Sequence, residues 1–353
     1  MNDKTHAITI QDRLVGDEHP CFVIAEAGVN HNGDPGLAYR LIDAACVAGA
    51  DAIKFQTFKA ENLVTPYAEK AEYQKKNDSS TGTQYQMLKN LELTEDDFKK
   101  LSGYARTKGL IFLSTAFDEE SVDVLIRLGV PAFKIPSGEI TNFPYIKKIA
   151  REKKPVILST GMSTLDEVLE AVRCLQQNGC REIVLLHCTT SYPAPLDSVN
   201  LRAMDTLREA LHLPAGYSDH TEGILVPVAA VARGACVIEK HITLDRTLPG
   251  PDHAASLEPG ELREMVSALR QVELALGSPE KRPDSCEIPN LKVARKSIVA
   301  GADIPEGTCI STSMLVLKRP GSGIEPGRLS DLVGRRTTRA IKKDALISWD
   351  MVE

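Results

Sequence analysis

Two histidines, His220 and His241, have the residue type and the spacing of a metal-binding pair. Each follows a short apolar run, and a helical segment at residues 222–233 separates the two runs. In a parallel strand–helix–strand unit the two strands lie side by side, so both imidazoles would reach one divalent ion at the carboxyl edge of the sheet. Neutral imidazole suits Mn, Fe, Co, Ni or Zn. The alternative is that backbone groups satisfy both histidines.

Polar residues at the ends of other apolar runs indicate a site for an anion. Lys54 and Lys134 lie inside such runs, where an ammonium group is costly unless it meets an anion. A phosphate or a carboxylate would satisfy both lysines. The candidate hydroxyl donors beside them are Thr115, Ser137 and Ser218. The alternative for each lysine is a structural ion pair with Glu26 or Glu139.

The apolar runs that carry these residues alternate regularly with helical segments. Expected strands cover residues 21–25, 52–57, 110–117, 132–136, 156–160, 183–189, 214–220 and 236–239. The alternation of apolar runs and helical segments is weaker at residues 60–89, which predicts a long loop over a site. About eight β/α units close a barrel whose active site lies at the carboxyl ends of the strands. The sequence therefore predicts an α/β fold, a (β/α)8 TIM barrel, over residues 1–277.

The sequence changes in character after residue 277. Residues 278–290 form a polar linker that contains prolines. Residues 291–353 alternate short β-like runs with turns. We expect a small β-rich domain there, with a thin hydrophobic core.

Composition excludes several classes of protein. The net charge of −6 is spread over 353 residues without blocks of like sign, and Trp349 is the single tryptophan, so no nucleic-acid groove is expected. No apolar run approaches membrane-spanning length, and the polar N-terminal residues differ from a signal peptide. The eight cysteines are scattered and form no C-x-x-C pair. They are typical of reduced thiols, so we expect a cytoplasmic protein with no membrane partner.

A series of short motifs along the chain matches those of one family. They are IAEAGVNHNG at residues 24–33, KFQT at 54–57, STAF at 114–117, KIPSGE at 134–139, HCT at 187–189, SDHT at 218–221, EKH at 239–241, GPDH at 250–253 and KRPG at 318–321. Each motif is weak alone, but their order across nearly the whole chain is specific. The chain resembles a sialic acid synthase, that is, an N-acylneuraminate or nonulosonic acid synthase. The resemblance implies a TIM barrel followed by a small β-rich antifreeze-like (SAF) domain.

The resemblance also implies an activity. The family is a transferase that joins phosphoenolpyruvate to an open-chain N-acylmannosamine-type sugar and releases phosphate with C–O cleavage. The sugar would be N-acetylmannosamine or 2,4-diacetamido-2,4,6-trideoxymannose, and the product N-acetylneuraminate or legionaminate. The stretch GPDHAASL at residues 250–257 resembles the legionaminate branch. A divalent ion on His220 and His241, Mn²⁺ with Mg²⁺ or Co²⁺ as alternatives, would polarise the sugar aldehyde. Glu26 or Glu139 would orient or deprotonate the water that adds afterwards.

By the same resemblance, the two substrates have separate binding residues. Phosphoenolpyruvate is assigned to Lys54, Thr115, Lys134, Ser137, Thr190 and Ser218, and the sugar to Gln56, Asn77, Tyr192, Asp252 and Arg319. Thr190 departs from the pattern, because synthases of the common sialic acid often carry Asn near this position. The family also implies a domain-swapped homodimer, in which Arg319 of one chain completes the other chain's site.

Two other function classes fit parts of the pattern. A Schiff-base TIM-barrel aldolase would use Lys54, Lys134 or Lys240 as its nucleophile and would need no metal. A carbohydrate- or ice-binding module on an inert barrel is the alternative outside enzymes. An inert barrel has no reason to direct so many charged groups to one face, so this alternative is the weaker one.

Overall fold

The computed structural model describes residues 7–77 and 82–353, without the side chains of residues 73, 76 and 77. The chain divides into two compact units, Met1–Gly277 and Ser278–Glu353. Within the described ranges, no helix combines the length and the apolar composition that crossing a membrane requires.

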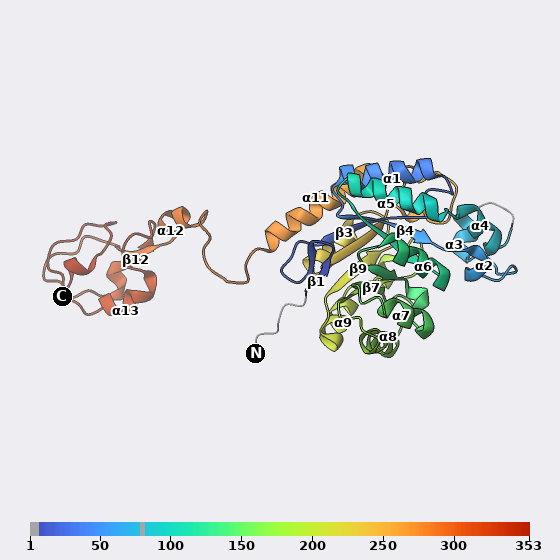
Figure 1. The fold of residues 1–353 in the computed structure, drawn as a ribbon. Helices are drawn as coiled ribbons and strands as arrows, with labels where there is room; N and C mark the ends of the chain where they lie inside the picture. Colours follow the sequence, from blue (N-terminus) through green and yellow to red (C-terminus); the bar gives the residue numbers. More distant parts are fainter. Residues whose placement is uncertain (1–6, 78–81) are drawn as a thin grey trace. The chain divides into compact units, whose positions relative to one another are not determined.

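Eight parallel strands of the first unit form a closed barrel (Figure 1). In order around the barrel they are β3 (Phe22–Gly28), β4 (Ala52–Thr57), β5 (Ile111–Ala116), β6 (Phe133–Ile135), β7 (Val156–Ser159), β8 (Ile183–Cys188), β9 (Ala215–Asp219) and β10 (Val237–His241). Strand β10 pairs with β3 and closes the ring, with His241 opposite Glu26. The predicted TIM barrel is confirmed.

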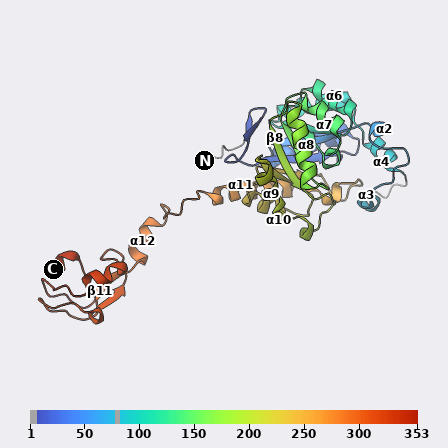
Figure 2. The ribbon, with the colours of Figure 1, turned by 90° about the horizontal axis from the view of Figure 1, so that it is seen from below.

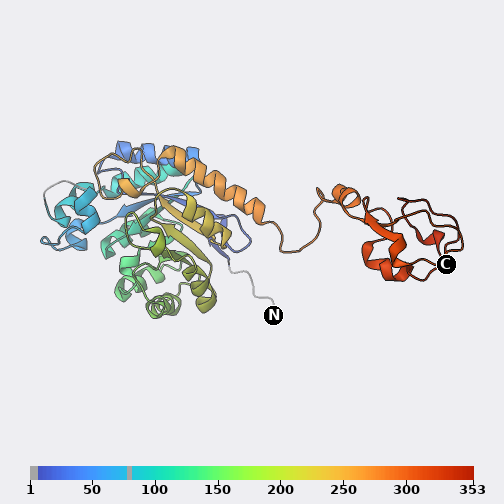
Figure 3. The same cartoon turned by 180° about the vertical axis from the view of Figure 1, so that it is seen from behind.

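Helices surround this barrel, as the views from below and from behind also show (Figures 2 and 3). They are α1 (Pro35–Ala48), α5 (Glu95–Thr107), α6 (Glu119–Leu128), α7 (Phe143–Ala150), α8 (Leu165–Gln177), α9 (Ala203–Leu211), α10 (Leu225–Ala232) and α11 (Pro259–Leu276). Several begin where a polar side chain accepts a hydrogen bond from a backbone N–H of the first turn: Asp34, Thr94, Asp118, Asn142 and Thr164. These caps fix where each helix starts.

Alternate residues of each strand face opposite sides of the barrel wall. One set, such as Val23 and Ala25, packs in the hydrophobic cluster beneath the helices. The other set, such as Phe22 and Ile24, belongs to a separate cluster in the barrel interior. Further along β3 the next residue of the interior set is Glu26, which is buried. The interior is thus apolar near the amino ends of the strands and polar near their carboxyl ends.

A short hairpin covers the apolar end of the interior. Strands β1 (Ala7–Ile10) and β2 (Arg13–Gly16) pair antiparallel. Ile8, Ile10 and Val15 are buried in the interior cluster. The sequence shows these N-terminal residues as polar overall, but the structure shows that alternate residues of the hairpin point into the core.

Three short helices follow β4 where a long loop was expected. They are α2 (Ala60–Leu63), α3 (Glu72–Asn77) and α4 (Gln84–Leu91). Thr83 caps α4 by accepting a hydrogen bond from the backbone N–H of Gln86. Met87 and Leu91 of α4 form a small hydrophobic cluster with Val29 and Phe58. Helix α4 is therefore packed against residues that follow β3 and β4, at the carboxyl face of the barrel.

The second unit contains little regular structure. Its elements are α12 (Ile288–Ala294), β11 (Ser297–Ala300), β12 (Leu315–Lys318) and α13 (Leu329–Leu332), with β11 and β12 antiparallel. Isolated bridges such as Ile304 with Ile341 connect its turns. A hydrophobic cluster that includes Ile298, Ile310 and Leu332 forms its core. This small β-rich unit has the character that the sequence predicts.

Candidate active site

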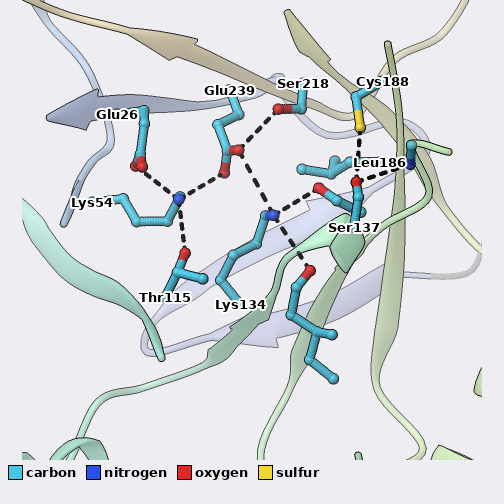
Figure 4. A network of polar contacts seen from close by, with 12 residues as sticks. Glu26, Lys54, Thr115, Lys134, Ser137, Leu186, Cys188, Ser218 and Glu239 are labelled. Atoms are coloured by element: carbon cyan, nitrogen blue, oxygen red, sulfur yellow. Dashed lines mark hydrogen bonds and ion pairs between the residues drawn. The ribbon is translucent and has the colours of Figure 1, made fainter. Parts of the chain in front are cut away.

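A buried cluster of charged side chains lies at the polar end of the barrel interior (Figure 4). Nζ of Lys54 lies 2.7 Å from Oε2 of Glu26 and 3.6 Å from Oε2 of Glu239. It also donates a hydrogen bond of 2.9 Å to Oγ1 of Thr115. Strand register brings these groups together, because Glu26 lies opposite Lys54 on the neighbouring strand.

A second lysine joins the cluster from the other side of Glu239. Nζ of Lys134 lies 3.7 Å from Oε1 of Glu239 and donates a hydrogen bond of 2.6 Å to Oγ of Ser159. Ser218 donates to the same Glu239 oxygen at 2.9 Å. The two lysines therefore share one carboxylate, and each also has a hydroxyl partner.

Burial and neighbouring charges separate the pKa values of the two carboxylates. Burial raises the pKa of Glu26 to about 7, although Lys54 opposes this shift. Burial acts on Glu239 in the same direction, but Lys134 and Lys54 outweigh it and hold its pKa at about 2. Near neutral pH Glu239 is an anion, whereas Glu26 exchanges a proton.

The same environment acts differently on the two lysines. Burial would lower the pKa of Lys54, but Glu239 and Glu26 outweigh it and raise the pKa. Burial lowers the pKa of Lys134, Glu239 opposes this, and Lys54 lowers it further. A bound anion would therefore stabilise the charged form of Lys134 in particular.

These side chains line an inner cavity of about 180 Å³. Its other lining residues include Gln56, Ser137, Ser159, Cys188, Thr190, Tyr192, His220 and His241. Oγ of Ser137 accepts a hydrogen bond from the backbone N–H of Gly161 at 2.9 Å and lies 3.2 Å from Sγ of Cys188. The cavity thus offers two ammonium groups and several hydroxyl groups, which is the chemistry of an anion site.

The two predicted metal ligands lie together at this cavity. The ring centroids of His220 and His241 are 5.6 Å apart. Nδ1 of His220 lies 2.8 Å from the carbonyl oxygen of Thr189, which only an N–H group satisfies. Nε2 of His220 is therefore unprotonated, and its lone pair is free to bind a metal ion. Nδ1 of His241 is buried without a hydrogen-bond partner, and Oδ2 of Asp252 is 4.0 Å away.

Both imidazoles are in the form that binds a metal. Burial lowers the pKa of His220 and lowers that of His241 well below its usual value, so both rings are neutral. Among the described residues, no group of three or more His, Cys, Asp or Glu side chains has the arrangement of a metal site. The pair fits a divalent ion that takes its remaining ligands from water or substrate.

A second cavity of about 260 Å³ adjoins the first. Gln56, Phe117, Tyr192 and His241 line both cavities. Asp252 lines only the second, and burial raises its pKa to about 6. His241 therefore stands where the two cavities meet, and His220 lines the inner cavity.

Comparison with known proteins identifies the family. The model of the NeuB family matches residues 41–281, and that of the SAF domain matches residues 295–353. The chain belongs to the NeuB family. It is 51% identical over 342 residues to N,N′-diacetyllegionaminic acid synthase of Legionella pneumophila, covering 96% of both chains. It is 41% identical to N-acetylneuraminate-9-phosphate synthase of Homo sapiens, covering 97% of this chain and 95% of the relative.

A solved structure agrees with this assignment. The N-acetylneuraminic acid (sialic acid) synthetase of Leptospira borgpetersenii, in complex with citrate, superimposes with a TM-score of 0.73 at 36% identity. The match covers 81% of this chain and 95% of that one. This NeuB family member is therefore an enzyme of the acid-synthase type.

Three predicted site residues of this NeuB family chain are not seen at the cavities. Glu139 is half-buried, accepts a hydrogen bond of 2.6 Å from Nδ2 of Asn142, and is not among the lining residues. Arg319 belongs to the second unit, where its Nε donates to the carbonyl oxygen of Ala294 at 2.9 Å. The side chain of Asn77 lies outside the part of the chain that the structure describes.

Two further strand-end residues face away from the cavity. Lys240 is fully buried and donates a hydrogen bond of 2.5 Å to Oδ2 of Asp219. His187 lies with Nε2 at 2.8 Å from the carbonyl oxygen of Val199. Neither lines the cavities, which removes Lys240 as a candidate nucleophile. Strand alternation could have shown this, since residue 240 lies between Glu239 and His241, which both face inward.

Proposed function

We propose that this enzyme condenses phosphoenolpyruvate with an open-chain N-acylmannosamine-type sugar, releases phosphate and forms a nonulosonic acid. The observation that carries the proposal is the inner cavity, where two buried lysines and several hydroxyl groups adjoin two neutral histidines. Phosphoenolpyruvate carries two anionic groups, a phosphate and a carboxylate. An anion-binding cavity beside a metal-binding pair suits its attack on an aldehyde.

The inner cavity would hold phosphoenolpyruvate through charge-assisted hydrogen bonds. In this proposal Lys54 and Lys134 each pair with one of its anionic groups. Their present hydroxyl partners, Thr115 and Ser159, lie close enough to donate to the same anion. The further donors are Ser137, Thr190 and Ser218.

A divalent ion, Mn²⁺ with Mg²⁺ or Co²⁺ as alternatives, is part of the proposal. Nε2 of His220 and the imidazole of His241 would hold it. Such an ion supplies Lewis-acid polarisation of a carbonyl group. The chain's own contribution is to keep both rings neutral by burial and to fix the His220 tautomer through the Thr189 carbonyl.

Proton transfer during water addition is assigned to Glu26. The electron pair of the enol double bond forms the new C–C bond, and the π pair of the aldehyde moves to its oxygen. That oxygen takes a proton from solvent, and an oxocarbenium-like carbon remains. Water adds to this carbon and gives its proton to Glu26, whose pKa of about 7 suits a base near neutrality. The tetrahedral intermediate then expels phosphate by C–O cleavage and leaves the ketoacid. Glu26 is preferred to Glu139 because only Glu26 lines the inner cavity.

The sugar would lie across the junction of the two cavities. Gln56, Tyr192 and Asp252 are the proposed contacts within the first unit, together with Asn77. Arg319 would contribute from the partner chain of a domain-swapped, cytoplasmic homodimer. The relatives are named for products that include diacetyllegionaminic acid and N-acetylneuraminate 9-phosphate, so both sugar types remain in the proposal.

A labelling experiment tests the reaction. We expect phosphate release from phosphoenolpyruvate that depends on an N-acyl amino sugar, and solvent heavy oxygen should appear in the ketoacid and not in the phosphate. Borohydride added during turnover should trap no adduct on Lys54 or Lys134. Label in the phosphate would rule out C–O cleavage, and a trapped lysine adduct would favour the Schiff-base aldolase.

A further inference from the structure

A buried ion pair lies next to the two proposed metal ligands along the chain. Lys240 precedes His241 on β10, and Asp219 precedes His220 at the end of β9. Nζ of Lys240 donates to Oδ2 of Asp219 at 2.5 Å, and both side chains are completely buried. Neither residue lines the two cavities, because alternation along the strand directs them to the other side of the barrel wall. The pair therefore has no direct role in holding substrate.

The ladder between β9 and β10 stops at this pair. Asp219 lies opposite Lys240 in the last position at which the two strands pair. His220 and Thr221 follow beyond the end of β9. Side chains hold the segment there: Nζ of Lys240 also donates to the carbonyl oxygen of Thr221, and Oδ1 of Asp219 accepts from the backbone N–H of Thr221 at 3.1 Å. The residue that follows His220 is thus tied to both strands.

His220 has further partners on a different element. Its Nδ1 contacts the carbonyl oxygen of Thr189 at 2.8 Å, and its carbonyl oxygen accepts from the backbone N–H of Ala194 at 2.9 Å. These contacts attach His220 to the segment that follows β8. Lys240 attaches the same stretch to β10, the strand that carries His241. The separation of the two imidazoles therefore depends on the contacts of Lys240.

Stability alone does not explain an ion pair in this position. Two charges lose their hydration on burial, and a well-packed apolar pair of similar volume is often equally stable or more stable. The best attested use of a buried polar pair is to fix the register of the elements that carry it. Here those elements carry two imidazoles, whose nitrogens must both lie about 2.1 Å from one ion. An error of a fraction of an ångström in register would disturb such a site.

We propose that Asp219 and Lys240 are positioning residues, which hold His220 and His241 at the separation that one divalent ion requires. This inference rests on the metal ion of the proposed function. Thr221 transmits the constraint, because both members of the pair bind its backbone. Loss of the pair should weaken metal binding, whereas the two lysines of the inner cavity keep their own partners.

The double substitution of Asp219→Asn with Lys240→Met tests this role. It removes the ion pair without leaving a buried charge, and asparagine can still accept from Thr221, so the variant should fold. We expect its dissociation constant for Mn²⁺, measured by calorimetric titration, to rise about 10–100-fold. Asp219→Asn alone should raise the constant in the same direction, and it carries the test if thermal melting shows that the double variant is unfolded. A constant that is unchanged in every folded variant would overturn the inference.

Steady-state kinetics separate positioning from general disruption. The Mn²⁺ concentration for half-maximal activity of the double variant should rise by the same factor as the dissociation constant. At saturating Mn²⁺, KM for phosphoenolpyruvate should stay within about two-fold of the unmutated value. A raised KM and a lowered kcat with unchanged Mn²⁺ affinity would show a structural role only, and would overturn the inference.

The matched control is an ion pair at the amino end of the barrel. Nη2 of Arg270 lies 3.1 Å from Oδ2 of Asp51, which also accepts from the backbone N–H of Val23. Arg270→Met should lower the melting temperature and leave the Mn²⁺ dissociation constant unchanged. An equal loss of Mn²⁺ affinity in Arg270→Met would overturn the inference, since any weakening of the barrel would then suffice. If the unmutated enzyme itself bound no Mn²⁺, the metal ion of the proposed function would be overturned instead.

Discussion

Glu26 and Glu139 illustrate how environment decides the role of a carboxylate. Glu26 is buried beside Lys54 with its pKa raised to about 7, whereas Glu139 pairs with Asn142 outside the cavities. Glu26→Gln preserves shape but cannot accept a proton, so kcat should fall by about 10²–10⁴-fold. Glu139→Gln should lower kcat by less than about ten-fold. A larger loss in Glu139→Gln than in Glu26→Gln, measured by phosphate release, would reverse the assignment.

The pH dependence of the unmutated enzyme should report the same group. Because burial raises the pKa of Glu26 to about 7, its base form is lost as the pH falls through that value. We therefore expect kcat/KM to rise with pH through about 7 and to become level above it. This rise should be absent in Glu26→Gln. An identical profile in that variant would assign the titration to another group.

Metal dependence tests the histidine pair. Treatment with a chelator should abolish turnover, and Mn²⁺ should restore it. His220→Ala and His241→Ala should each weaken Mn²⁺ binding at least about ten-fold in calorimetric titration. The control is His212→Asn at an exposed helix end, where asparagine tolerates the left-handed backbone conformation. Full activity in metal-free protein would reject the metal site.

Among the elements, the β1–β2 hairpin contributes stability without contributing to the site. Ile10 is fully buried in the barrel interior, whereas Leu14 of the same hairpin is half exposed. Ile10→Ala should lower the free energy of unfolding by about 2–5 kcal/mol, because it leaves a cavity. Leu14→Ala should change it by less than about 0.5 kcal/mol. Urea unfolding measures both, and kcat of folded Ile10→Ala should equal that of the unmutated enzyme.

The difference between the predicted and observed elements has a physical cause. The barrel strands were predictable because each is an apolar run between helical segments long enough to show a period, such as residues 165–177. The hairpin and helices α2, α3 and α4 are too short for such a signal. Phe58 and Met87 were therefore not predicted as site residues, although they line the second cavity.

A site residue could be predicted from the sequence where its side chain would be unfavourable in its position without a bound partner. Lys54 and Lys134 were found because a lysine inside an apolar strand needs a partner, and both belong to the charged cluster. His187 also ends a strand, but its side chain points away from the cavity, toward the carbonyl oxygen of Val199. The end of a strand tells how far along the barrel axis a residue lies. Only the alternation of residues along the strand tells whether its side chain faces the barrel interior or the surrounding helices.

At the scale of the whole molecule, the second unit holds the one proposed sugar contact that lies outside the barrel unit. A unit of this size has a thin core, and such units dock on their own chain or, by swapping, on a partner. We expect the swapped arrangement, in which Arg319 of one chain serves the other chain's site. Arg319→Ala and His241→Ala should then each be nearly inactive as pure dimers.

Mixing these two inactive variants distinguishes the arrangements. In a mixed dimer with swapped units, one site carries both substitutions and the other carries neither. With equal mixing about half of the dimers are mixed and half of their sites are intact, so activity should recover to roughly a quarter of the unmutated level. If Arg319 serves its own chain, every site carries one substitution and no activity returns. Co-expression with two different affinity tags isolates the mixed dimer, and an inactive mixed dimer would reject the swap.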